Sequence, residues 1–285
     1  MPRPRPTNRA KRFQNRPNVQ RKERVIKRAL LIGINYTGTK HALSGCINDS
    51  HNLKDFLVKS NYFKQNEIIM MNDKIKGGYY PSRRNIEAQF RNLVSFANKH
   101  RSSKVLLFVS YSGHGSYMID RNGDEKDGKD EVLCPIDCDR RGYIKDDFIK
   151  AQLINRLPSN VKLVMMVDAC HSGTMCDLKF DYDKNNLGYS GSSKKSQSKC
   201  DVVMISGCMD SQTSADAYLR NKGKFQYQGA MTASFLANYH DNISYYDLLT
   251  KMRKWLKNRS FDQIPQLSSG KLINIRKPFL LGGFD

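Results

Sequence analysis

The chain contains two stretches, KVLLFVSYSGHG (Lys104–Gly115) and VKLVMMVDACHSG (Val161–Gly173), in which an apolar run ends in a short polar motif. Each apolar run has the length and composition of a buried strand. Open α/β sheets place their chemistry beyond the carboxyl ends of parallel strands, so the pattern predicts that His114 and Cys170 meet at one sheet edge. A thiol beside an imidazole is the minimum requirement for a cysteine nucleophile.

Shorter apolar runs on either side of these stretches complete an alternation of strands and helices. This alternation predicts an α/β fold, with a mostly parallel central sheet of about six or more strands flanked by helices on both faces. The expected strands are Ala29–Asn35, Ile68–Met71, Lys104–Ser110, Val161–Val167 and Val202–Ser206. The expected helices are Cys46–Ser60, a segment after Ser82 that ends near Lys99, Asp146–Leu157, Ala230–Tyr239 and Tyr245–Leu256.

The composition is that of a soluble protein, with 39% hydrophobic residues and a mean hydropathy of −0.63. No apolar run approaches the roughly 18 residues of a membrane helix. The first residues are basic and rich in proline and lack an apolar stretch, so we do not expect them to act as a secretory signal. The seven cysteines include no C-x-x-C pair, and Cys134 and Cys138 lack the second ligand pair of a zinc site. We therefore expect reduced thiols in the cytoplasm, with access to the nucleus, and no organic cofactor.

Nearly half of the net charge of +21 comes from residues 1–28, which hold eleven Lys and Arg and one acid. This segment is rich in Pro, Arg and Asn, so we expect a disordered leader at 1–28 and one folded domain at 29–285. Three interpretations of the leader remain open. It is a solvated tail, a removable pro-segment, or an arm that docks on RNA, on an anionic membrane or on an acidic partner. Any contact with nucleic acid would be electrostatic and sensitive to salt.

The segment 183–199 (DKNNLGYSGSSKKSQSK) is polar, basic and rich in Gly and Ser. It predicts a long flexible loop close to the edge that carries Cys170. A protease that cuts after basic residues would find four candidate self-cleavage sites there: Lys184, Lys194, Lys195 and Lys199.

Several residues around the two motifs suggest roles in catalysis and binding. His171 competes with His114 as the base, but as the neighbour of Cys170 it should point the other way. The amides of Gly115 and Cys170 are candidate donors to an oxyanion. Asp168 precedes Cys170 by two residues and Asp49 opens the first helix, and two acids near a thiol suggest a site for an Arg or Lys side chain.

The densest acidic stretch is Asp120–Glu131 (DRNGDEKDGKDE). It fails the EF-hand pattern, because its glycine falls at the wrong position. It is either a solvated loop or part of another calcium site. The four acids of that alternative site are Asp130, Asp146, Asp147 and Asp177.

From about Lys27 to Phe284 the chain resembles a metacaspase of the type I kind, a caspase-fold cysteine peptidase. The strings that carry the resemblance are ALLIGINY (29–36), LSGCINDSHNLKDFL (43–57), YSGHG (111–115), DGKDEVLCPID (127–137), YIKDDF (143–148), DACHSGT (168–174), SGCMDSQTSADA (206–217), GAMTASF (229–235) and PQLSS (265–269). The resemblance implies a caspase-like fold and a catalytic dyad of Cys170 and His114. It also implies cleavage after Arg or Lys, rather than after Asp.

The resemblance also assigns binding residues and regulation. Family positions for the substrate pocket fall on Cys46, Asp49, Ser112 and Asp168, and those for calcium fall on Asp130, Asp146, Asp147 and Asp177. It implies a monomer that acts on proteins, and a leader like a short pro-segment suggests a zymogen that processes itself. The favoured function is thus a calcium-stimulated, Arg/Lys-specific endopeptidase. The alternative is a scaffold, aggregate-binding or nucleic-acid-binding module that acts through the basic arm.

Overall fold

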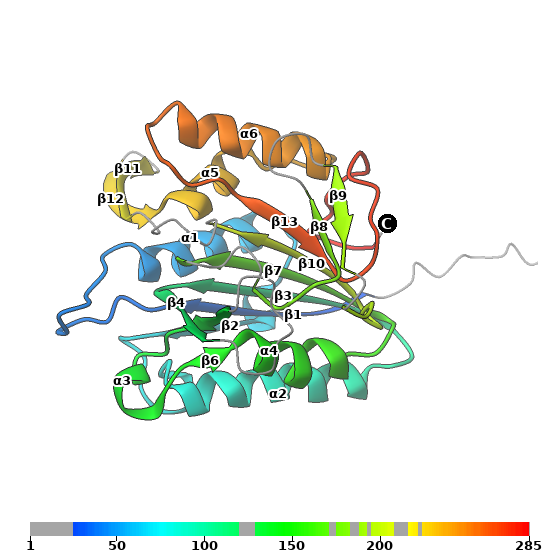
Figure 1. Cartoon of the computed structure of the whole chain (residues 1–285), viewed down its shortest axis with the longest axis horizontal. Helices are drawn as coiled ribbons and strands as arrows, with labels where there is room; N and C mark the ends of the chain where they lie inside the picture. The colour runs from blue at the N-terminus through cyan, green and yellow to red at the C-terminus, as the bar shows by residue number, and fades with distance from the viewer. Residues whose placement is uncertain are drawn as a thin grey trace, which may run out of the picture.

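The computed structural model describes residues 25–119, 129–170, 175–182, 188–192, 195–207, 216–221 and 224–284. Within these ranges, the largest sheet has eight strands in the order β2-β1-β3-β7-β10-β13-β8-β9 (Figure 1). The strands are β1 (Val25–Gly33), β2 (Ile68–Asn72), β3 (Lys104–Ser112), β7 (Val161–Asp168), β8 (Phe180–Tyr182), β9 (Tyr189–Gly191), β10 (Asp201–Ser206) and β13 (Gln266–Ser269). Strands β2, β1, β3, β7 and β10 are parallel, and β13, β8 and β9 extend the sheet antiparallel.

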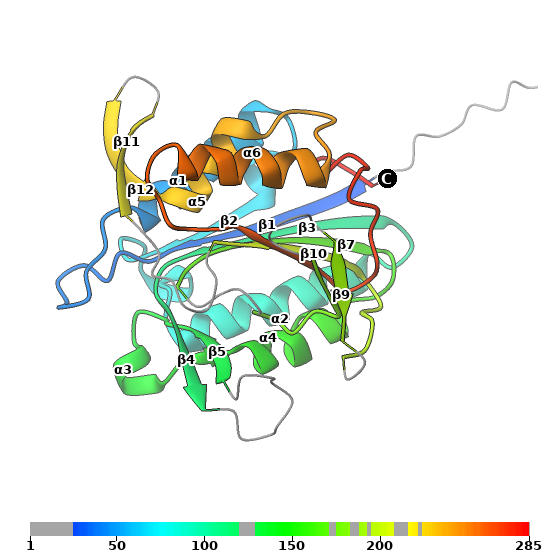
Figure 2. The ribbon, with the colours of Figure 1, turned by 45° about the horizontal axis from the view of Figure 1, so that its top comes forward.

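Helices cover both faces of this sheet, as Figure 2 shows in a second view. On one face lie α2 (Arg83–Lys99) and α4 (Asp146–Gln152), and on the other lie α1 (Cys46–Lys59), α5 (Ala230–Asn238) and α6 (Tyr245–Lys257). The remaining short helices are α3 (Cys138–Arg141), η1 (Gln65–Glu67), η2 (Gly77–Tyr79) and η3 (Ile154–Arg156). None of the helices in the described ranges combines the length and hydropathy of a membrane span.

The central strands are apolar on both faces because both faces are covered. Leu107 of β3 and Leu163 of β7 pack into the core under α2 and α4. Phe108 and Val164, one position further along each strand, pack into the core under α1, α5 and α6. This burial on both sides explains why the strands read as continuous apolar runs rather than as alternating ones.

Two smaller sheets lie near the carboxyl ends of the parallel strands. Strands β4 (Gly115–Ile119), β5 (Lys129–Leu133) and β6 (Ile144–Lys145) form an antiparallel sheet of three strands. Strands β11 (Asp216–Asn221) and β12 (Lys224–Gly229) form a hairpin. In Figure 1 these carboxyl ends lie at the left, and the amino ends lie at the right beside the C-terminus.

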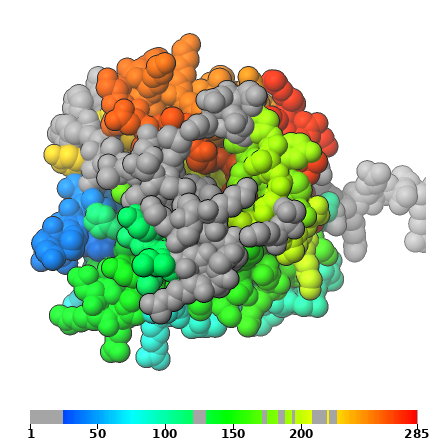
Figure 3. All heavy atoms as spheres, viewed as in Figure 1, coloured from blue at the N-terminus to red at the C-terminus, as the bar shows by residue number. Residues whose placement is uncertain are grey.

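The expected mostly parallel sheet with helices on both faces is confirmed, with three corrections. Strand β1 begins at Val25, so residues 25–28 belong to the sheet rather than to the leader. Residues 189–191 of the expected loop 183–199 form β9, which pairs with β8 at the edge of the sheet. Figure 3 shows this yellow-green region at the surface, next to the red C-terminal segment. The helix expected over 146–157 ends at Gln152, and η3 follows it.

Candidate functional site

The segments that follow β3 and β7 are in contact at the carboxyl edge of the sheet. Ser112 and Asp168 are register partners at the last position of each strand. Immediately beyond them, the Gly113 amide donates a hydrogen bond to the Asp168 carbonyl at 3.3 Å. The α-carbon of Gly115 packs so tightly against the Cys170 carbonyl that a methyl group there would collide with it. The structure therefore brings together the two segments that carry His114 and Cys170.

Two buried tyrosines hold the backbone of His114. The His114 amide donates to the hydroxyl of Tyr36 at 3.0 Å, and the hydroxyl of Tyr111 donates to the His114 carbonyl at 2.9 Å. The amide of Cys134 donates to the same carbonyl at 3.1 Å. Burial raises the pKa of both tyrosines well above the usual value, so Tyr111 keeps the proton that it donates to the His114 carbonyl.

The imidazole of His114 is oriented by a backbone carbonyl. Its Nε2 lies 2.7 Å from the carbonyl oxygen of His41, and its ring stacks at a tilt on Tyr36, with centroids 4.7 Å apart. A carbonyl oxygen only accepts hydrogen bonds, so the proton of a neutral His114 sits on Nε2. Nδ1 is then the nitrogen that can accept a proton from a neighbouring group.

Cys170 is less buried than Cys134, which follows β5. Cys170 lies two residues beyond the end of β7 and is half-buried. Burial, together with the neighbouring thiol of Cys138, raises the pKa of Cys134 to about 12. Cys134 and Cys138 line a hollow of about 220 Å³ that also includes His114 and Tyr143. At neutral pH Cys134 therefore stays a thiol that packs beside the His114 loop.

Two carboxylates are buried side by side behind the same edge. Asp49 and Asp168 are 0% and 3% exposed. The Gly229 amide donates to both oxygens of Asp49, at 2.9 and 3.0 Å, whereas Asp168 accepts 2.9 Å bonds from the amide and the hydroxyl of Thr232. A methyl group on Gly229 would collide with Asp168 Oδ2 and come within 2.7 Å of Asp49 Oδ2. Gly229 thus forms a wall that both acids face.

The other two expected pocket residues lie at the same edge. Ser112, at the end of β3, is 2% exposed, and Cys46, the first residue of α1, is 5% exposed. Gly33 of β1 connects them, because it is the register partner of Ser112 and its α-carbon packs against the Cys46 carbonyl. The four residues predicted for a substrate pocket therefore gather around the carboxyl ends of β1, β3 and β7.

A second group of buried acids lies beside β5, β6 and α4. Asp130, Asp146 and Asp177 are each about 98% buried, and so is Glu131, which the sequence reasoning did not single out. Burial, followed by the charges of Asp177 and Glu131, raises the pKa of Asp146 to about 9. Asp147 lies at the same helix start, and its amide donates to Asp146 Oδ1 at 2.8 Å.

Lysine side chains supply the positive charge next to these acids. The ammonium of Lys195 lies 2.5 Å from Asp177 Oδ1, and that of Lys150 lies 3.6 Å from Asp177 Oδ2. Lys145 pairs with Asp130. In this arrangement the described part of the chain holds no cluster of three or more side chains positioned to ligate a metal ion.

Comparison with known proteins identifies the family. The family model described as the metacaspase, peptidase C14 domain matches residues 27–179, more than half of the chain. The chain belongs to the metacaspase family. This membership confirms the predicted caspase-like fold and a cysteine peptidase domain.

Three curated fungal relatives extend the match. Metacaspase-1 of Cryptococcus neoformans var. neoformans serotype D (strain JEC21) is 35% identical over 292 residues, covering 85% of this chain and 62% of the relative. Metacaspase-1 of Meyerozyma guilliermondii is also 35% identical, covering 85% and 69%. The Saccharomyces cerevisiae (strain S288c) protein is 33% identical, covering 90% and 69%. The chain thus spans about two thirds of the length of these relatives.

A solved structure shares the fold at lower sequence identity. Protein GSU0716 from Geobacter sulfurreducens superposes with a TM-score of 0.60 at 20% identity, covering 89% of this metacaspase and 97% of that chain. At this identity the likeness concerns the fold alone.

Some predicted residues of this metacaspase lie outside the described ranges, namely His171, Lys184, Lys194 and the leader up to residue 24. Of the remaining candidate cleavage sites, Lys199 is exposed, and the side chain of Lys195 is only 13% exposed because it reaches Asp177.

Sequence reasoning also missed several positioning residues in this metacaspase. These are Tyr36, His41, Tyr111, Gly229 and Thr232. The string GAMTASF at 229–235 contains two of them, but nothing local in it indicates contact with Asp49 and Asp168. His41 contributes a backbone carbonyl, which has no side-chain signature at all.

Proposed function

We propose that this metacaspase cleaves peptide bonds after Arg or Lys, with Cys170 as the nucleophile and His114 as its base. The observation that carries the proposal is the pair of buried carboxylates, Asp49 and Asp168, adjoining the segment that carries Cys170. N–H and O–H donors to a carboxylate favour its charged form. A guanidinium or ammonium entering there would meet two negative charges, whereas an Asp side chain would be repelled.

The geometry around His114 supports a specific sequence of proton transfers. Nδ1 of His114 takes the thiol proton, and Sγ of Cys170 attacks the carbonyl carbon of the scissile bond. The amides of Gly115 and Cys170 would hold the oxyanion of the tetrahedral intermediate. When the C–N bond breaks, the proton on His114 passes to the leaving amine. Water, deprotonated by His114, then cleaves the thioester and restores the thiol.

We also propose that calcium stimulates this activity through the second group of acids. Buried carboxylate oxygens are the donors that a hard divalent cation prefers, so the chemistry of the donor set fits. Asp130, Asp146, Asp147 and Asp177 would hold the ion, with Glu131 beside them. The bound ion would supply positive charge among carboxylates that otherwise repel one another. The raised pKa of Asp146 and the lysines around Asp177 support this, because both reflect a local excess of negative charge.

Self-processing is part of the same proposal. Lys199 is exposed, so the active site of another molecule of the protein can reach it, whereas Lys195 must leave Asp177 before it can be cut.

The six described cysteines are thiols, which supports a reducing compartment such as the cytoplasm. The proposed substrates are proteins with Arg or Lys at the cleaved position, and the proposed state is a monomer. Binding of an anionic partner by the basic arm stays a prediction, because residues 1–24 lie outside the described structure.

Peptide substrates test this proposal directly. Purified full-length chain is assayed on fluorogenic peptides that end in Arg, Lys or Asp, with and without calcium, and products are mapped by mass spectrometry. We expect cleavage after Arg and Lys that requires both Cys170 and His114, and retention of activity in the matched thiol control Cys138→Ala. A preference for the Asp peptide, or undiminished activity in Cys170→Ala, would refute the assignment.

A further inference from the structure

Tyr36, which contacts His114, has a backbone conformation that tyrosine rarely adopts. Its φ angle is 50°, in the left-handed region, where the β-carbon of an ordinary residue crowds the following carbonyl oxygen. This conformation costs free energy, and it persists only where the surrounding structure holds it in place. Tyr36 is 3% exposed, and its ring and its hydroxyl both contact His114. The strained residue therefore lies directly beside the proposed base.

The carboxylate of Asp73 accepts hydrogen bonds from the residues on both sides of Tyr36. The amide of Asn35 donates to Asp73 Oδ1 at 3.0 Å, and the amide of Thr37 donates to Oδ2 at 2.9 Å. The hydroxyl of Thr37 adds a bond to Oδ2 at 3.2 Å. Asp73 directly follows β2, which pairs in register with β1, so the carboxylate is attached to the sheet from which Tyr36 emerges. One side chain thus fixes the backbone before and after the left-handed residue.

The segment that follows Tyr36 supplies the second contact to His114. Residues 37–42 lie exposed at the surface, and the His41 carbonyl within them is 2.7 Å from His114 Nε2. Packing in the core therefore does little to hold this carbonyl, and hydrogen bonds must position it. The hydroxyl of Thr39 provides the link, because it donates to the Tyr36 carbonyl at 2.8 Å and accepts from the His41 amide at 3.2 Å. The backbone of Tyr36 thus determines where the His41 carbonyl lies.

We propose that Asp73 is a positioning residue for His114 and that it acts through Tyr36 and the segment after it. The proposal rests on the function proposed above, in which His114 is the base. By holding Tyr36 in its left-handed conformation, Asp73 fixes both the hydroxyl that accepts from the His114 amide and the carbonyl that orients the imidazole. Rate depends steeply on such alignment, because a misplacement of about 1 Å can cost about 100-fold. The proposed Arg/Lys pocket is held by β12 and α5 instead, so substrate binding should change little.

Asp73→Asn in the full-length chain tests this proposal. Asparagine has the size of aspartate but offers one oxygen and one nitrogen, so the amide of Asn35 or of Thr37 loses its acceptor. On a fluorogenic Arg peptide, we expect kcat to fall about 10- to 100-fold while KM stays within about twofold. Thr37→Val removes only the hydroxyl bond and keeps both amide bonds, so it should lower kcat about threefold.

Nitrogen NMR of the imidazole gives a readout that does not depend on turnover. The chain is labelled with nitrogen-15 histidine and measured at a pH at which the ring is neutral, and His114→Ala identifies the His114 signals. In the unmodified chain the proton should sit on Nε2, because the His41 carbonyl accepts it. In Asp73→Asn we expect a mixture of the Nε2–H and Nδ1–H forms. A residue that only supports the fold would lower the melting temperature without changing this ratio.

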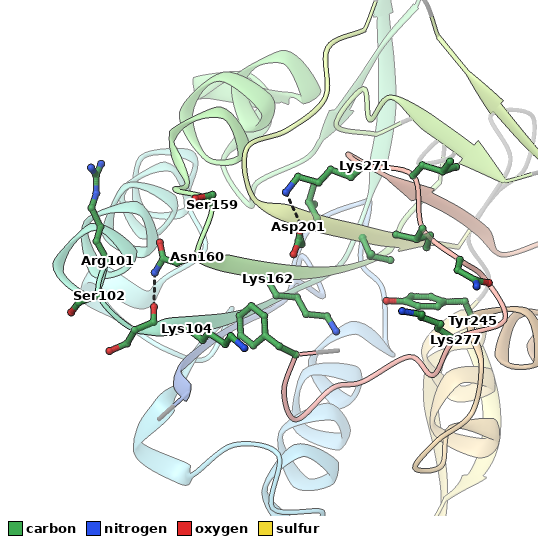
Figure 4. Close-up of a pocket in the computed structure, with 17 residues that line it drawn as sticks. Arg101, Ser102, Lys104, Ser159, Asn160, Lys162, Asp201, Tyr245, Lys271 and Lys277 are labelled. Carbon is green, nitrogen blue, oxygen red and sulfur yellow. Dashed lines mark hydrogen bonds and ion pairs between the residues drawn. The ribbon is translucent and has the colours of Figure 1, made fainter. Parts of the chain in front are cut away.

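Asp201→Asn is the matched control, since it removes the same charge at the opposite end of the sheet. Asp201 begins β10 and pairs with Lys271 at 2.7 Å, beside a cavity of about 670 Å³ at the amino ends of the strands (Figure 4). This variant should keep kcat and the Nε2–H form of His114. Thermal unfolding checks that each variant is folded.

The proposal is overturned if folded Asp73→Asn keeps both kcat and the Nε2–H form, or if Asp201→Asn loses as much activity. It is also overturned if KM rises as much as kcat falls, because the substrate pocket would then be what Asp73 supports. If Asp73→Asn does not fold, an unchanged kcat and an unchanged ring signal in Thr37→Val overturn it as well. Undiminished activity in Cys170→Ala would refute the proposed function instead, and the ring signals would still decide the role of Asp73.

Discussion

Asp168 at the end of β7 and Asp146 at the start of α4 are almost equally buried, 3% and 1% exposed, but their surroundings differ. Asp168 accepts hydrogen bonds from both the amide and the hydroxyl of Thr232. Asp146 accepts one from the neighbouring amide of Asp147. Burial, followed by the nearby carboxylates of Asp177 and Glu131, raises its pKa to about 9. Hydrogen-bond donors favour the charged form of Asp168, whereas burial and the nearby carboxylates disfavour the charged form of Asp146.

This difference separates the proposed substrate pocket, whose negative charge accepts hydrogen bonds, from the proposed calcium site, whose acids repel one another. The donors at Asp49 and Asp168 come from β12 and α5, so the folded chain itself holds the negative charges in place. The acids around Asp146 instead have lysine side chains beside them, the ammoniums of Lys145, Lys150 and Lys195. Substrate recognition should therefore be lost by neutralising the first pair, and regulation should be altered by changing the second group.

The largest effect should come from Asp168→Asn. The amide oxygen of asparagine still accepts the bonds from Thr232, so the fold should be kept while the charge is lost. Removing one partner of a buried charge pair costs about 3–5 kcal/mol, so kcat/KM on an Arg peptide should fall about 100- to 5,000-fold. Asp55→Asn, which neutralises an exposed acid of α1, is the matched control and should retain activity. Equal activity of the two variants would show that Asp168 does not contact the substrate.

A methyl group at Gly229 should disturb the same pair without removing a charge. Gly229→Ala forces Asp168 and Asp49 apart, and overpacking of this kind typically costs about 1–3 kcal/mol of stability. We expect about a tenfold loss of kcat/KM, together with a lower melting temperature. Gly78→Ala is the control, because nothing lies within 4 Å of the added carbon there. An unchanged melting temperature in Gly229→Ala would contradict the tight packing of both acids against this wall.

Neutralising Asp146 should change the response to calcium rather than substrate choice. Because its pKa is raised to about 9, Asp146 must take up a proton when the chain folds at neutral pH, and this costs stability. Asp146→Asn removes that cost, so the calcium-free protein should melt about 2–4 °C higher for each kcal/mol of relief. Calcium should raise the melting temperature of the unmodified chain by mass action, and it should do so much less in the variant. Scanning calorimetry with and without calcium measures both changes. A calcium shift of the same size in Asp146→Asn would remove this residue from the ligand set.

The parts of the molecule that could be predicted are those encoded locally. The runs in β3 and β7 are apolar over their whole length because both faces are covered, so their ends predicted where His114 and Cys170 emerge. Strand β9 has only three residues and no apolar period, so its pairing with β8 left no trace in the sequence. The contact between Asp49 and Gly229 spans 180 residues and uses a backbone amide, which every residue except proline offers.

The smallest expected effect concerns Lys195, which ties the segment after β9 to the second group of acids. Its ammonium and a calcium ion would compete for the same oxygens of Asp177. Lys195→Met removes the competitor, and a partly buried pair of this kind is worth about 1 kcal/mol, so the calcium concentration for half-maximal activity should fall about fivefold. Lys195→Arg should restore the original midpoint, and Lys199→Met at an exposed position should leave it unchanged. An unchanged or higher midpoint in Lys195→Met would mean that Asp177 holds this lysine for structural reasons alone, and that calcium acts elsewhere.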